Sequence, residues 1–70
     1  MLASFLRSVD DSYKIEFRTD AERRLLIVKV TKEFLYKEVY IAFELLSDED
    51  SIVRAIRNTI TLMEDVYEHK

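Results

Sequence analysis

The C-terminal third of the chain carries its strongest amphipathic pattern. Between Ser51 and Glu68, apolar residues recur every three or four positions, the spacing that gathers side chains on one side of an α-helix. The apolar arc covers roughly 180°, whereas a helix that packs on one sheet usually needs an arc of about 100°. The pattern therefore predicts a long helix whose apolar surface contacts more than one structural element.

This wide arc divides into two neighbouring stripes. We expect the stripe with the larger side chains to pack on the protein's own sheet. The second stripe has smaller side chains, which suit the close approach of another helix, and we interpret it as a surface that binds a partner protein. The first stripe consists of Ile52, Ile56, Ile60, Met63 and Tyr67, widened by Val53, and the second of Ala55, Thr59, Leu62 and Val66.

The first half of the chain predicts a short helix followed by a hairpin. Apolar residues at helical spacing favour a helix over residues 1–9, which the polar residues 10–12 end. Residues 13–18 then alternate between apolar and charged side chains, as in a strand with one buried face. The polar residues 19–22 predict a type I turn, inside a hairpin loop of four or five residues, in which no residue needs positive φ.

The second strand, expected over residues 24–31, is apolar on both faces. Leu26 and Val28 belong to one face, while Leu25 and Ile27 make the opposite face apolar as well. We therefore interpret Leu25 and Ile27 as a second candidate surface, which an added strand or a partner chain covers.

Residues 34–46 are compatible with a helix or a strand. They contain strong helix formers, yet apolar and polar residues alternate from Val39 to Leu45, and we predict a strand over residues 36–46. Residues 47–51 are typical of a helix start. The expected fold is α+β in the order α-β-β-β-α, a three-stranded antiparallel meander between a short N-terminal and a long C-terminal helix, in one small domain of residues 1–70.

Composition excludes much of the usual catalytic chemistry. The chain has no glycine, so it lacks the phosphate-binding loops and nucleophile elbows that need this residue. It has no cysteine, and its single histidine, His69, is next to the C-terminus. We expect a non-enzymatic protein without catalytic, metal-binding or cofactor-binding residues.

The 70 residues make a small and marginally stable domain that neither disulfides nor a metal can stabilise. We therefore expect a homodimer or a heterodimer. The lack of cysteine is typical of a reducing compartment, and no apolar run is long enough to span a membrane, so we expect a cytoplasmic protein.

Charged and aromatic residues leave several alternatives open. The net charge is −3, and no basic patch predicts autonomous nucleic-acid binding. The acidic residues 48–50 and 64–65 either serve a helix start and a solvated surface or imitate phosphates. The aromatic residues either pack in a core or interface or stack on bases. Likewise, some helix residues either face solvent or contact RNA phosphates or a partner's carboxylates. The aromatic residues are Tyr13, Phe34, Tyr36 and Tyr40, and these helix residues are Arg54, Arg57, Asn58 and Thr61.

Residues 53–62, which read VRAIRNTITL, resemble a helix of a known family. The family is the small dimerising subunit of the KEOPS complex, which installs threonylcarbamoyl groups on transfer-RNA adenosine. Its helix typically reads L-R-A-x-x-N-S-x-L-R. Arg54, Ala55 and Asn58 are identical to this pattern, Val53 and Thr59 are conservative replacements, and Leu62 stands where the family has its second arginine.

The resemblance implies a non-catalytic accessory subunit of that complex. The family usually begins strand-helix-strand-strand-helix, whereas this chain begins with a helix, so it looks like a shorter paralogue of the subunit. In the family, paired subunits join their strands into a larger sheet, and their long helices pack on the catalytic subunit. The resemblance thus implies pairing with a small-subunit paralogue or with itself, and tRNA contact only within the complex.

A second function class fits the topology and charge alone. Small α-β-β-β-α chains with acidic ends also occur among the inhibitors that mobile elements encode, of the anti-CRISPR kind. Such an inhibitor would bind a nuclease through an acidic surface. We favour the accessory subunit because Arg54, Ala55 and Asn58 are positive evidence for it.

Overall fold

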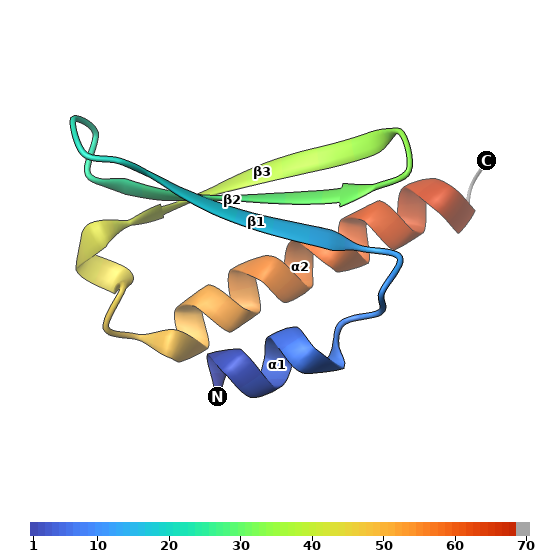
Figure 1. Ribbon diagram of the computed structural model, residues 1–70, viewed down its shortest axis with the longest axis horizontal. Helices are drawn as coiled ribbons and strands as arrows, with labels where there is room; N and C mark the ends of the chain where they lie inside the picture. The colour runs from blue at the N-terminus through green and yellow to red at the C-terminus, as the bar shows by residue number, and fades with distance from the viewer. Residues whose placement is uncertain (69–70) are drawn as a thin grey trace.

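The computed structural model describes residues 1–68, which form two layers (Figure 1). One layer is an antiparallel sheet in the order β1-β2-β3, and the other contains both helices. The order α-β-β-β-α confirms the expected α+β fold. The elements are α1 (Leu2–Ser8), β1 (Lys14–Asp20), β2 (Leu25–Lys32), β3 (Leu35–Ala42), the short 3-10 helix η1 (Phe43–Leu45) and α2 (Glu49–Glu68).

The sheet has one apolar face, against which α2 lies. Val28 and Val30 of β2 are fully buried there, and Val28 pairs with Phe17 of β1 and Val39 of β3. Ile56 and Met63 of α2 are also fully buried and belong to the same core cluster. The larger stripe of α2 therefore packs on the protein's own sheet, as its side-chain sizes predict.

The N-terminus of α2 is capped by Asp48. The backbone N–H of Ser51 donates to Asp48 Oδ1 at 3.3 Å, and the Ser51 hydroxyl donates to Oδ2 at 2.8 Å. These hydrogen bonds, from the Ser51 side chain first and its backbone second, lower the pKa of Asp48 below the ordinary value of 3.8. At least part of the acidic segment 48–50 therefore serves the helix start.

The first hairpin corrects one expectation. Residues 21–24 connect the paired residues Asp20 and Leu25, and Arg24, the last of the four, has φ 57°. The loop therefore has four residues, as expected, but it lies over residues 21–24 rather than 19–22, and the positive φ falls at Arg24, just beyond the predicted turn. Asp20 shapes the beginning of the loop by accepting a hydrogen bond from the Arg23 N–H at 3.2 Å, and the chain then reverses through Arg24.

The third strand is confirmed as a strand but ends earlier than predicted. Ala42 pairs with Leu25, the first residue of β2, so β2 offers no further partner for a longer β3. Phe43 donates its N–H to the Arg24 carbonyl at 3.0 Å, and the chain turns into η1. The apolar alternation beyond residue 42 thus belongs to the 3-10 helix and the residues that follow it.

Candidate protein-binding surface

Part of the apolar surplus of α2 is covered by α1. Phe5 and Val9 pack against the core cluster, as does Ile60 of α2. The guanidinium carbon of Arg57 lies 5.4 Å from the centre of the Phe5 ring, so α1 also contacts the α2 surface beyond the apolar arc. The N-terminal helix of the same chain therefore covers part of the wide apolar arc of α2, for which the sequence predicts several contacts.

The second stripe of α2 is divided by the fold. Thr59 is 7% exposed and donates its hydroxyl to the Ala55 carbonyl at 2.9 Å, so it faces the interior. Ala55 is half-buried against the core. Leu62 and Val66, by contrast, are 55% and 45% exposed. Of the four residues that we interpret as the partner surface, Leu62 and Val66 are the accessible ones.

The β2–β3 hairpin extends this exposed apolar area. Its two loop residues are Glu33, with φ 56°, and Phe34, which is fully exposed. Phe34 and Leu35 line a hollow of about 150 Å³ together with Val66 and Tyr67 of α2. Tyr67 fastens the helix to the hairpin by donating its hydroxyl to the Lys32 carbonyl at 2.6 Å. We call Phe34, Leu35, Leu62 and Val66 the helix-hairpin surface.

Leu25 and Ile27 lie on the sheet face that points away from α2. Ile27 is only 7% exposed, because neighbours on its own sheet cover it. It pairs with Arg18 on one side and Tyr40 on the other. Glu38 links these neighbours, with its Oε2 3.0 Å from Arg18 Nη2 and its Oε1 accepting from the Tyr40 hydroxyl at 3.1 Å.

This polar network changes the interpretation of the outer face. The hydrogen bond to Glu38, with that carboxylate's charge, raises the pKa of Tyr40. Leu25 is half-buried at the end of β2, so neither it nor Ile27 forms an open apolar surface. The alternation of β2 correctly places both residues on the second face, but it does not reveal that side chains of β1 and β3 cover Ile27.

The candidate RNA or carboxylate contacts of α2 are exposed. Arg54, Asn58 and Arg57 all reach solvent, although Arg57 also stacks on Phe5. Among the aromatic residues, Tyr13 belongs to the core, whereas the tyrosines of β3, like Phe34, are exposed. The sequence leaves Phe34 open between core, interface and base stacking, and the fold, which brings Val66 beside it, makes it part of a candidate binding surface.

Within residues 1–68, no group of three or more His, Cys, Asp and Glu side chains could hold a metal ion. Over the same residues, no helix is long and apolar enough to cross a membrane. His69 lies outside the residues that the structure describes. Comparison with protein-family models, curated proteins and solved structures finds no match to this chain.

Proposed function

We propose that this chain is a non-catalytic accessory subunit that binds proteins, and specifically that it serves the KEOPS complex. The observation that carries the protein-binding role is the helix-hairpin surface, where the large apolar side chains Phe34, Leu62 and Val66 are exposed. Contiguous apolar side chains at the surface of a small domain are typical of protein interaction sites.

The shape of this surface supports docking of a protein. Leu62 and Val66 are one turn apart on α2 and form a short apolar ridge. The hollow between Val66 and Phe34 is about 150 Å³, room for one or two inserted side chains of a partner rather than for a cofactor. A helix or loop with apolar anchors is the natural ligand of such a ridge and hollow.

The KEOPS assignment rests on the resemblance of α2 to the family helix. Arg54 and Asn58, two of the three identical residues, are exposed and available to a partner's carboxylates or to RNA. The third, Ala55, is half-buried. Leu62, where the family has arginine, supports contact with the catalytic subunit rather than with tRNA. We further propose pairing with a small-subunit paralogue or with itself.

Co-purification from the native organism tests this proposal. The tagged wild-type chain, a Leu62→Arg variant and a Thr61→Arg control are each purified in separate experiments. The partners that each one recovers are identified by mass spectrometry. Thr61 is exposed and lies about 100° around the helix from Leu62. We expect the wild type and the control to recover the KEOPS catalytic and small subunits, and Leu62→Arg to lose the catalytic subunit while its circular dichroism is retained.

Other recoveries have defined meanings. Recovery of a nuclease in place of KEOPS subunits contradicts the assignment and supports the mobile-element inhibitor. Recovery of neither a nuclease nor KEOPS subunits contradicts both functions. Equal recovery of the KEOPS catalytic subunit with Leu62→Arg refutes the helix-hairpin surface as the docking site.

A further inference from the structure

Strand β1 is an edge of the sheet with an unusual order of charges. Within residues 1–68 it pairs with β2 alone, so its other side is open to an added strand. Every second residue of β1 points to the outer face, and these residues alternate in sign. They are Lys14, Glu16, Arg18 and Asp20, in that order.

We propose that a second copy of this chain pairs antiparallel along β1, with a twofold axis at Phe17. In this register Glu16 faces Arg18 of the second copy, and Lys14 faces its Asp20. Symmetry repeats both contacts, so all four charged residues of each β1 face an opposite charge. Opposite charges directly across an antiparallel pair stabilise it, whereas like charges destabilise it.

The alternation selects this register over its neighbours. Antiparallel self-pairing with an axis at residue 16 would place Lys14 opposite Arg18 and Glu16 opposite itself. An axis at residue 18 would place Glu16 opposite Asp20 and Arg18 opposite itself. Both registers keep the side chains on their proper faces but bring like charges together. The charge pattern thus favours the axis at Phe17.

The other edge of the sheet has no such complementarity. Strand β3 carries two charged residues, Lys37 and Glu38, which are adjacent and so lie on opposite faces. Antiparallel self-pairing matches residues on the same face, so Lys37 and Glu38 cannot face each other across a twofold axis. Charge complementarity therefore assigns the second copy to β1.

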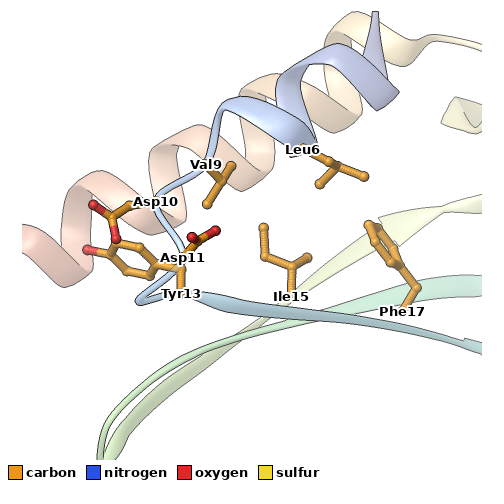
Figure 2. A pocket seen from close by; sticks show the side chains of 7 residues that line it. All are labelled: Leu6, Val9, Asp10, Asp11, Tyr13, Ile15 and Phe17. Atoms are coloured by element: carbon orange, nitrogen blue, oxygen red, sulfur yellow. The ribbon is translucent and has the colours of Figure 1, made fainter.

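The helix side of β1 offers apolar surface at the same place. Phe17 is 44% exposed, and it borders a hollow of about 290 Å³ between α1 and β1. Figure 2 shows Leu6 and Val9 pointing toward Ile15 and Phe17 across this hollow. A copy paired through β1 would bring its own Phe17 against this Phe17 and cover both rings, which adds apolar burial to the charge pairs.

This inference rests on the pairing part of the proposed function and names the partner as a second copy. Its surface, β1, is separate from the helix-hairpin surface that docks the catalytic subunit. A Leu62→Arg variant should therefore still dimerise, and a β1 variant should still present Phe34 and Val66. The two proposals consequently fail in different experiments.

Sedimentation equilibrium on complementary variants tests the pairing. In a homodimer, Glu16→Lys places a lysine opposite Arg18, and Arg18→Glu places a glutamate opposite Glu16. Each variant alone should therefore dimerise at least roughly tenfold more weakly than wild type. Mixed in equal amounts, the two restore an opposite charge at both contacts and should form a heterodimer. Circular dichroism checks that each variant is folded.

Cross-linking tests the register independently of charge. The chain has no cysteine, so Phe17→Cys introduces a single thiol that meets its own symmetry mate and should form a disulfide-linked dimer under mild oxidation. Thr19→Cys, on the same face, would lie about 13 Å from its mate and should not cross-link. A monomeric wild type, mixed variants that stay apart, or cross-linking of Thr19→Cys in preference to Phe17→Cys would each overturn the proposal.

Discussion

Tyr13 and Tyr67, two tyrosines at the end of the core, differ in the hydrogen bonding of their hydroxyl groups. The Tyr13 hydroxyl is buried and has no hydrogen-bond partner among residues 1–68, and burial, the largest cause, raises its pKa. The Tyr67 hydroxyl donates to the Lys32 carbonyl. The Lys32 ammonium lies 4.9 Å from the Tyr13 ring centre and 5.0 Å from that of Tyr67, so both rings contact one cation.

This difference predicts opposite effects of removing the two hydroxyls. Tyr13→Phe removes a buried hydroxyl that makes no hydrogen bond within the described part of the chain, so the free energy of unfolding should stay the same or rise by about 1 kcal/mol. Tyr67→Phe leaves the Lys32 carbonyl without this donor and should lower stability. Urea denaturation of both variants measures the difference. A larger loss for Tyr13→Phe would contradict this account of the core.

At the scale of the residue, the sequence pattern does not reveal that Arg24 adopts a positive φ. Polar loop residues predicted a turn, and a turn forms, but its geometry depends on how β1 and β2 twist against each other. No glycine or asparagine marks the position of positive φ. Arginine occupies it at φ 57°, a conformation that costs roughly 1–2 kcal/mol for a residue with a Cβ.

Glycine at this position should therefore be tolerated. We expect Arg24→Gly to leave the free energy of unfolding unchanged or to raise it by up to about 1 kcal/mol, because the strain it relieves offsets the entropy of the freer unfolded chain. Arg23→Gly, which introduces glycine at negative φ, should destabilise by about 1 kcal/mol. Thermal denaturation compares them, and equal losses would show that Arg24 is not strained.

At the scale of elements, α2 is the part that its sequence specifies most fully. The helical period predicts its existence, and residues 47–51 predict its start, where Asp48 forms the cap. The period does not predict which side of the helix stays open. α1 covers the side of Ile60, while Leu62 lies on the uncovered side, and this choice depends on the path of the chain between α1 and β1.

Because the cap contains a carboxylate, we expect the stability of α2 to decrease as the pH falls through the acidic range. The pKa of Asp48 is below 3.8 in the folded chain, so the unfolded chain binds protons first as the pH falls. The stabilisation is fully present above the unfolded pKa and is lost as the pH falls through the folded one. Asp48→Asn keeps a capping oxygen without a titrating charge, so its stability should decline less between about pH 5 and about pH 2.

Urea denaturation across this range measures the two slopes. Asp10 provides a matched comparison, because hydrogen bonds from Ser12, chiefly from its backbone, lower its pKa as well. Asp10→Asn should flatten the acid decline in the same direction. Parallel curves for wild type and Asp48→Asn would show that the cap carries no such dependence.

At the scale of the whole molecule, the order of elements and the antiparallel meander follow from the sequence, whereas the candidate binding surfaces do not. Phe34 and Val66 are distant in the sequence and become neighbours only when α2 runs under the β2–β3 hairpin (Figure 1). Alternation alone predicts an accessible Ile27, yet Arg18 and Tyr40 flank it in the folded sheet. Surfaces built from several elements require the fold itself.

The two surfaces that we propose for two kinds of partner are separate in the folded molecule. The helix-hairpin surface lies along Leu62 and Val66, on the side of α2 away from α1. The β1 edge lies beside α1 and carries the alternating charges. Both can therefore be occupied together, as a subunit that pairs and docks requires. The helix-hairpin surface is central, since the proposed function depends on it whether or not the chain dimerises.

The most direct measurement is the affinity of the purified chain for the purified KEOPS catalytic subunit, by isothermal titration calorimetry. We predict saturable binding of wild type and of Thr61→Arg. Leu62→Arg should bind at least about tenfold more weakly, because it places a charge in the buried centre of the contact. No binding by wild type, or equal binding by folded Leu62→Arg, would contradict the account.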